Sequence, residues 1–219
     1  MLKLPEKTLY NRKIPKNKFY EKIKANSKLK DKFTRQIDSI VWKHKLSKQT
    51  MNIEPTEEIQ EIQIFEIYLK QKELSKELLE NIDRAIPYPI LFVLKYNDEA
   101  KLTIAYKQRN KNDENKFVID SYYESEWTSI ENLSIDISSG LNLQTLYENI
   151  IKSLISVEAE KNDSIQEIIE YQKNVDQLKY EISKLESKMR NEKQFNKKVK
   201  LNMELQNKKK ELEEELSEQ

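Results

Sequence analysis

Residues 165–216 read IQEIIEYQKNVDQLKYEISKLESKMRNEKQFNKKVKLNMELQNKKKELEEEL and contain neither Gly nor Pro. In the first half of this stretch, apolar side chains recur in alternating steps of three and four residues: Ile168, Tyr171, Val175, Leu178, Ile182, Leu185 and Met189. This spacing is the a/d pattern of a coiled coil. A continuous helix over the whole stretch would extend roughly 80 Å. Because no compact domain needs so long a helix to cover its own core, the pattern predicts that it meets a partner helix.

The pattern is interrupted at residues 190–196, which read RNEKQFN, before apolar positions resume at Val199, Met203, Leu205, Leu212 and Leu216. Two interpretations remain open. A coiled coil tolerates a polar residue at a core position, so one long helix can run through the interruption. Alternatively, the chain turns here and forms an antiparallel helical hairpin. The absence of Gly and Pro favours the continuous helix, and in either form residues 158–219 are expected to be a helical arm.

Composition excludes several kinds of site. The 219 residues include no Cys and a single His, which rules out disulfides, thiolate metal ligands, a Cys nucleophile and a His-rich metal site. Charged residues form 35% of the chain, a high share that a long solvated helix explains. The N-terminal residues lack the continuous apolar core of a signal peptide, and no apolar run of about 18 residues is present. We therefore expect a cytoplasmic protein with no membrane-spanning segment and no bound cofactor.

The net charge of +1 conceals a strong asymmetry along the chain. Residues 1–50 hold 15 Lys and Arg against 4 Asp and Glu, whereas residues 51–160 hold 11 against 21. A basic segment joined to an acidic body suits contact with the phosphates of a nucleic acid. The same pattern also fits a solvated pair of helices, or a segment that folds back on the acidic body. The candidate nucleic-acid-binding residues are Lys22, Lys24, Lys28, Lys30, Lys32, Lys43 and Lys45.

Residues 1–37 are interpreted as a basic helical segment. Pro5 and Pro15 disfavour a helix in the first 15 residues. A short helix is expected to follow, and Ser27 suits the N-cap of a second one. The apolar residues of this second helix are spaced four apart, at Leu29, Phe33 and Ile37.

Residues 38–157 are expected to form one α+β domain around a mostly antiparallel sheet of four to six strands. Alternating or continuous apolar runs predict strands over 38–46, 59–70, 89–96, 101–107, 116–122 and a shorter stretch around 133–137. In the second of these, the apolar positions change face at Ile64 and Phe65. This change indicates either a β-bulge or a strand that is covered on both sides.

Two amphipathic helices are expected to pack against this sheet. The first follows a possible cap at Ser75 and ends before Pro87, and the second begins at Leu143. The second helix is expected to cross the sheet and to close the domain near Val157. Residues 49–56 are interpreted as a connector.

No catalytic constellation is evident. His44 is expected on the same face of its strand as Trp42, with no acidic or hydroxyl residue at triad-like spacing, and is interpreted as a structural histidine. Asp38, Glu66 and Lys70 resemble a metal-nuclease set, but such sites place the second acid and the lysine two residues apart so that both face the metal. Here the spacing is four. We therefore predict no catalytic residue and no metal site.

Five clusters of residues carry a resemblance over nearly the full length of the chain. They are IVWKHKL at 40–46 with Thr50 and Asn52, EIQIF at 61–65, DRAIPYP at 83–89, GLNL at 140–143 with Tyr147, and EKQFNKKV at 192–199 with Leu201 and Asn202. Together they resemble a bacterial family of uncharacterised proteins whose genes lie beside helicases, DNA methyltransferases and restriction subunits. The resemblance implies a context, DNA-targeting defence loci, and no activity. It also makes QFN at 194–196 a candidate recognition turn, which favours the helical hairpin.

We expect a non-enzymatic accessory subunit that binds a helicase or restriction-type partner through its C-terminal helices and places its basic segment near DNA. The candidate partner-binding residues are Ile168, Val175, Leu178, Ile182, Leu185, Met189, Gln194, Phe195 and Asn196. Two alternatives remain open. One is a metal-dependent nuclease, or another nucleic-acid-processing enzyme, that uses the acidic body. The other is a structural homodimer formed through the coiled coil.

Overall fold

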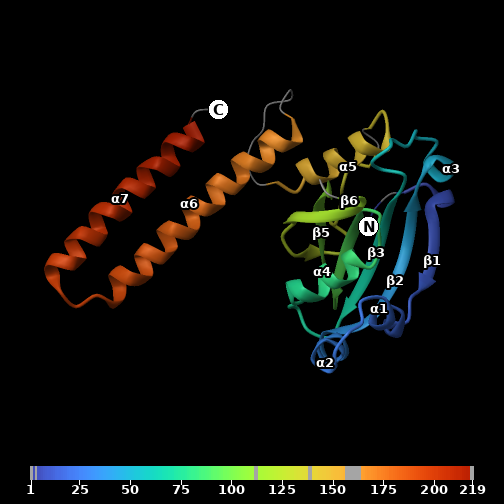
Figure 1. Cartoon of the computed structure of the whole chain (residues 1–219), viewed down its shortest axis with the longest axis horizontal. Coiled ribbons are helices and arrows are strands. Elements are labelled where there is room, and N and C mark those ends of the chain that lie inside the picture. The colour runs from blue at the N-terminus through green and yellow to red at the C-terminus, as the bar shows by residue number, and fades with distance from the viewer. Residues whose placement is uncertain (1, 3, 111–112, 138–139, 156–163, 218–219) are drawn as a thin grey trace. The chain divides into compact units, whose positions relative to one another are not determined.

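The computed structural model describes residues 2, 4–110, 113–137, 140–155 and 164–217 (Figure 1). The chain divides into two compact units, Met1–Leu154 and Ile155–Gln219. The first unit contains a seven-stranded sheet with helices, and the second contains two long helices. The expected α+β class, with a mostly antiparallel sheet and a helical C-terminal region, is confirmed. The expected domain end at Val157 lies outside the described residues.

The strands are β1 (Leu9–Lys13), β2 (Ile37–Leu46), β3 (Ile62–Leu69), β4 (Ile90–Tyr96), β5 (Glu99–Asn110), β6 (Asp113–Glu124) and β7 (Thr128–Ser129). They follow the order β1-β2-β3-β4-β5-β6, and β7 pairs with β5. In the described sheet, β3 and β4 run parallel and the other neighbouring strands run antiparallel. A parallel pair needs a crossover, which α4 (Lys76–Arg84) provides. A two-residue turn at Asn97 and Asp98 joins β4 to β5, and the φ of 51° at Asn97 is one that Asn tolerates.

The first 37 residues are part of the sheet unit, which corrects their separation from the α+β domain. β1 is an edge strand that pairs with β2, and α1 (Lys16–Lys22) and α2 (Ser27–Gln36) lie against the core. Phe19 and Phe33 are 4% and 0% exposed. Burying such side chains stabilises a fold by about 1.5–3 kcal/mol each, so the basic helices cannot leave the sheet without a large cost. The N-cap of α2 is Asn26 rather than Ser27, because the Asn26 side chain accepts a hydrogen bond from the Leu29 amide at 2.9 Å.

The core between these helices and the sheet also takes in α4. Phe65 of β3 and Phe92 of β4 are fully buried there, with their rings edge to face and 6.4 Å between centroids. The next residues along β3, Ile64 and Glu66, point to the opposite face of the sheet and are also buried. β3 is therefore a strand covered on both sides, which explains its change of apolar face.

The bulge lies in β2 rather than in β3. Trp42 pairs with Phe65 and His44 pairs with Ile64, so two steps along β2 match one step along β3 at Lys43. As a result, His44 lies on the face of Ile64, opposite to the face that carries Trp42. The expectation that Trp42 and His44 share one face is wrong, because the extra residue reverses the alternation.

Two local predictions also change. The segment predicted as a strand around 133–137 has no strand structure, although Leu133 and Ile137 are 4% and 5% exposed and contribute to the core as loop residues. The predicted connector at 49–56 contains a short helix, α3 (Lys48–Met51), closed by Asn52 in the left-handed conformation at φ 55°. The last helix of the unit is α5 (Leu143–Lys152), whose apolar side is buried as expected.

The C-terminal unit is an antiparallel helical hairpin of α6 (Ile165–Asn191) and α7 (Phe195–Ser217) (Figure 1). The Tyr171 hydroxyl donates to the Glu215 carbonyl at 2.8 Å, near the open end of the hairpin. Glu192 adopts an extended conformation that ends α6, and its carboxylate accepts the Gln194 amide at 2.8 Å. This bond satisfies one of the donors that the start of a helix leaves unpaired. Of the two interpretations left open for this stretch, the structure has the hairpin. No helix in the described ranges has the length and hydropathy needed to cross a membrane.

Candidate functional site

A buried carboxylate and lysine lie side by side in the centre of the sheet. The Glu66 carboxylate on β3 accepts hydrogen bonds from Lys95 Nζ on β4 at 2.6 Å and from the Tyr68 hydroxyl at 2.8 Å. The Glu66 and Lys95 side chains are 7% and 9% exposed. They meet because Tyr68 is the partner of Lys95 in the parallel register, and Glu66 shares a face with both.

The surroundings keep this carboxylate ionised. Burial by itself would raise the pKa of Glu66, but the hydrogen bonds from Lys95 and Tyr68 outweigh burial and hold that pKa below its ordinary value. Burial and the bond to Glu66 raise the pKa of Tyr68 to about 12. The Glu66 carboxylate is therefore matched by two donors from the sheet itself, Lys95 and Tyr68.

A hollow of about 240 Å³ borders this set. It is lined by Leu2, Leu9, Lys43, His44, Ile64, Glu66, Val93, Lys95, Ile130 and Leu133. His44 Nδ1 lies 2.9 Å from the Thr8 hydroxyl oxygen, and that hydroxyl donates to the Pro5 carbonyl at 2.7 Å. Since the single Thr8 proton is engaged with Pro5, His44 Nδ1 is the donor in its contact with Thr8. Burial, and then the nearby Lys43, lower the pKa of His44.

A second buried ion pair joins α4 to β5. Lys107 Nζ lies 2.7 Å from the Asp83 carboxylate, and the two side chains are 3% and 0% exposed. The Tyr122 hydroxyl donates to the same carboxylate at 2.9 Å. Lys107 also donates to the carbonyls of Asp83, Ile86 and Tyr88, at and beyond the end of α4, where helical partners are missing. Burial raises the pKa of Asp83 and lowers that of Lys107. The pair therefore anchors the DRAIPYP turn to the sheet.

The suspected nuclease set is not assembled. The Lys70 ammonium donates to the Thr34 carbonyl at 2.9 Å, while Glu66 is held by Lys95. Across the described ranges, no group of three or more His, Asp and Glu side chains is arranged to hold a metal ion. The roles of Lys95 and Lys107 are not evident from the sequence, because each lysine meets its acid on an element that is distant in the chain, β3 for Lys95 and α4 for Lys107, and no local spacing signals such a pair.

The seven candidate nucleic-acid-binding lysines divide into two groups. Lys32 and Lys45 form ion pairs with Glu77 and Glu61, and Lys43 donates a hydrogen bond to an asparagine of β1. The remaining side chains lie exposed on α1, α2 and the turn between them: Lys22, Lys24, Lys28 and Lys30. Four of the lysines therefore lie together on one exposed stretch of the sheet unit, and the other three contact side chains of neighbouring elements.

The predicted coiled-coil residues of α6 have α7 of the same chain as their neighbouring helix. These residues of the a/d pattern are called here the seam. Ile168 and Val175 are buried, and the later seam residues Leu178, Ile182, Leu185 and Met189 are half-buried. The remaining predicted partner-binding residues, Gln194, Phe195 and Asn196, lie at the start of α7 and are exposed.

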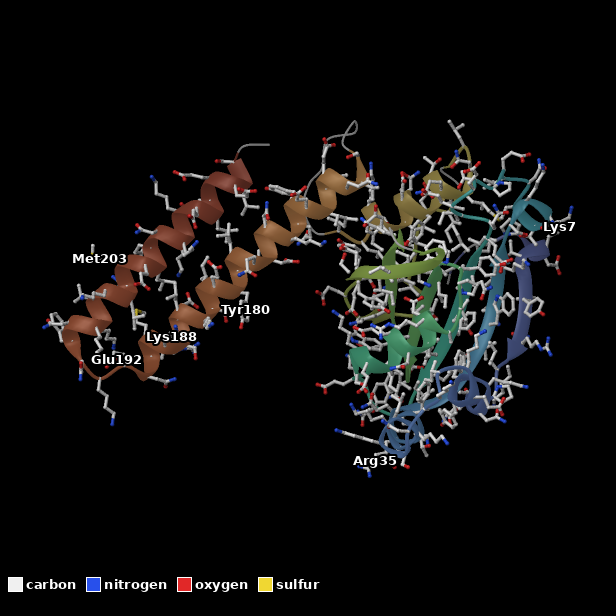
Figure 2. All side chains as sticks on the ribbon, viewed as in Figure 1. Lys7, Arg35, Tyr180, Lys188, Glu192 and Met203 are labelled. Carbon is white, nitrogen blue, oxygen red and sulfur yellow. The ribbon has the colours of Figure 1, made fainter. Side chains whose placement is uncertain are left out.

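A second apolar stripe on α7 was not anticipated. Phe195, Val199 and Met203, called here the outer stripe, are 78%, 43% and 63% exposed. Figure 2 shows Met203 on the side of α7 that is turned away from α6. Leu205, only two residues further on, is 3% exposed. At 3.6 residues per turn, a step of two places neighbours on nearly opposite sides of a helix. That step in the sequence is the signal that separates the outer stripe from the seam.

Several residues that carry the family resemblance have roles in the fold. Thr50 completes the capping box of α3, and Asn52 takes the left-handed conformation that ends it. Asp83 belongs to the buried pair described above. Gly140 has no room for a side chain, since a Cβ would lie 2.9 Å from a backbone nitrogen of α5. The Tyr147 hydroxyl donates to a carbonyl of β5 at 2.5 Å.

The fold defines a protein with an α+β sheet domain followed by a helical-hairpin arm. A family model described as a domain of unknown function, DUF4391, matches residues 2–212. The chain therefore belongs to this family. No curated protein and no solved structure matched the chain.

Proposed function

We propose that this protein is a non-enzymatic accessory subunit of a bacterial DNA-targeting complex of the kind encoded in defence loci. Its partner would be a helicase or restriction-type protein. The observation that carries the proposal is the outer stripe of Phe195, Val199 and Met203. Apolar side chains that gather on an exposed surface mark interaction sites. Their four-residue spacing suits packing against an amphipathic helix of a partner.

The buried acids of the sheet domain support the same proposal. Among its buried acids, Glu66 and Asp83 are each matched by a lysine and a tyrosine, and Glu61 is matched by Lys45 and Gln63. Side chains engaged in this way serve the fold. The genes that neighbour those of the resembling family support a DNA-targeting context. The exposed lysines of α1 and α2 support contact with phosphates.

Co-purification with proteins encoded by neighbouring genes tests the partner surface. In the full-length chain, Val199→Asp with Met203→Asp should weaken partner capture by about tenfold or more, because two carboxylates would be buried at the interface. Leu141→Asp is the matched control, since Leu141 is 94% exposed and lies in the other unit. It should leave capture unchanged. Equal capture by both variants would overturn the proposal, as would Mg²⁺-dependent cleavage of DNA by the purified chain. If the native chain sediments as a dimer and the stripe variant as a monomer, the structural homodimer is favoured instead.

Salt-dependent DNA binding tests the basic surface. Replacing Lys22, Lys24, Lys28 and Lys30 with Gln should reduce the log–log salt slope for duplex DNA by about 3 to 4, at roughly 0.9 per phosphate contact. Lys32→Gln with Lys45→Gln is the control, because these two lysines are engaged with Glu77 and Glu61. If the salt slopes of the two variants are equal, the assignment of DNA binding to this surface is wrong.

A further inference from the structure

The tip of the hairpin, residues 188–200, differs sharply in charge from the remainder of the two helices. The tip holds six Lys and Arg against one Glu. Residues 164–187 and 201–217 together hold six Lys and Arg against ten Asp and Glu. The positive charge of the arm is therefore concentrated where α6 ends and α7 begins.

The single acid of the tip does not neutralise this charge. The Glu192 carboxylate accepts the Gln194 amide, and the backbone amides of Gln194 and Lys193 help to hold the pKa of Glu192 below its ordinary value. Glu192 thus shapes the turn and the start of α7. The lysines around it are exposed to solvent.

Three consecutive lysines of α7, beyond the tip, form ion pairs. Lys208 and Lys209 pair across the hairpin with Glu181 at 3.2 Å and Glu186 at 2.9 Å, and Lys210 pairs with Glu214 along α7 at 3.2 Å. In the described part of the arm, no ion pair involves the tip lysines Lys188, Lys193, Lys197, Lys198 and Lys200. Neighbouring like charges on a helix are destabilising. The tip therefore carries a charge pattern that the fold of the hairpin does not require.

The tip is also slightly hollowed. A hollow of about 540 Å³ lies between the ends of the two helices, lined by Ser187, Lys188, Asn191, Glu192, Lys197, Lys200 and Leu201. Figure 2 shows Lys188 and Glu192 at this end of the hairpin. Lys188 approaches the hollow from α6, and Lys197 and Lys200 approach it from α7. The dipole of α7 adds to the positive potential at this end of the helix.

We propose that the hairpin tip binds single-stranded nucleic acid, with its lysines on successive phosphates and Phe195 stacked on an unpaired base. Phe195 is 78% exposed at the start of α7, among the tip lysines. A basic surface interleaved with an exposed aromatic ring is the usual arrangement for single strands. An anionic bilayer would call for a broad apolar face, and an acidic polypeptide would contact the tip lysines without needing an aromatic ring among them. This site goes beyond the proposed function, which places nucleic acid on α1 and α2.

Fluorescence anisotropy with the full-length chain and labelled oligo(dT) of about 12 nucleotides tests the proposal, because single-strand sites span about 4–16 nucleotides. The tip variant Lys188→Gln, Lys197→Gln, Lys200→Gln should bind at least about tenfold more weakly, with a salt slope lower by about 2. Phe195→Ala should weaken binding by about five- to 150-fold without changing the slope, and Phe195→Trp should retain it. The matched control is Lys208→Gln, Lys209→Gln, Lys210→Gln, which removes three paired lysines and should leave binding unchanged.

The outcomes are distinct. The tip variant should melt at the same temperature as the native chain or higher, because like charges have been removed; weaker binding with a lower melting temperature would indicate a structural role and overturn the proposal. Equal binding by the tip variant and its control would overturn it too.

If polyglutamate or phosphatidylserine vesicles bind the native chain and oligo(dT) does not, the nucleic-acid assignment is wrong. If binding is lost only when Lys22, Lys24, Lys28 and Lys30 are replaced, the assignment of the site to the hairpin tip is wrong and the proposed function is unaffected.

Discussion

The sheet unit and the hairpin use charge in opposite ways. In the sheet unit, Lys107 pairs with Asp83 and Lys95 with Glu66, and all four side chains are less than a tenth exposed. In the hairpin, the pairs of α7 lysines with α6 glutamates have side chains that are at least 34% exposed. A buried pair is costly to break, because the remaining charge stays in the interior. An exposed pair adds little stability. Buried charge therefore specifies geometry in the first unit, whereas the ion pairs between the two helices of the hairpin lie at its surface.

Apolar side chains show the same contrast. The sheet unit fully buries several large aromatic side chains, among them Phe33, Phe65 and Phe92. The hairpin leaves its outer stripe in solvent and half-buries much of its seam. Few buried apolar contacts imply a lower local stability, which suits a segment that completes its packing on binding. We interpret the first unit as a scaffold and the second as its binding arm.

Removing Lys107 should produce the largest effect. Lys107→Ala leaves the Asp83 carboxylate buried without its cation, at a cost of about 3–5 kcal/mol. Lys48→Ala removes a cation from an exposed pair with Glu54 in the same unit and should have little effect. Urea unfolding followed by tryptophan fluorescence reports on this unit, because both tryptophans of the chain lie in it. Equal unfolding midpoints for the two variants would erase the contrast between buried and exposed pairs.

Within the hairpin, two neighbouring substitutions should differ strongly. Leu205→Asp places a carboxylate at a position that is 3% exposed and should destabilise the hairpin by at least about 2 kcal/mol. Met203→Asp, at a position 63% exposed, should leave the thermal transition nearly unchanged. Circular dichroism at 222 nm, which is dominated by helix, measures both. If Met203→Asp is as harmful as Leu205→Asp, the outer stripe belongs to the hairpin's own packing and is not a free surface.

The smallest expected effect concerns pH. Burial lowers the pKa of His44 in the folded chain, so the unfolded chain binds the proton first as pH falls. This contribution to stability is complete above the unfolded pKa of about 6.5 and is lost progressively below it. Because the chain has a single His, His44→Gln should flatten the dependence of stability on pH between about 7 and 5.5. Urea midpoints across this range measure it, and an unchanged dependence would place the titrating group elsewhere in the chain.

Much of the sheet unit could be predicted from the sequence, because its elements rest on local patterns. The continuous apolar run that became β4 and the amphipathic α4 and α5 need only the neighbouring residues to specify them. The site was less accessible. The partners of Glu66 and Asp83 come from strands that are distant in sequence, and the face of His44 depends on one extra residue in β2. Such features depend on register, which no local spacing reveals.

The arm shows the same division most clearly. By itself, the sequence determined that residues 165–216 are helical, that a seam of apolar residues lies along α6, and that basic residues gather at 188–200, because helix periodicity and charge are local properties. Only the tertiary structure decided that the helix breaks at Glu192 and that α7 returns along α6. It thereby divided the apolar residues of α7 between a buried and an exposed side. The physical reason is that a helix face acquires its role from whatever packs against it, and that neighbour is set by the path of the whole chain.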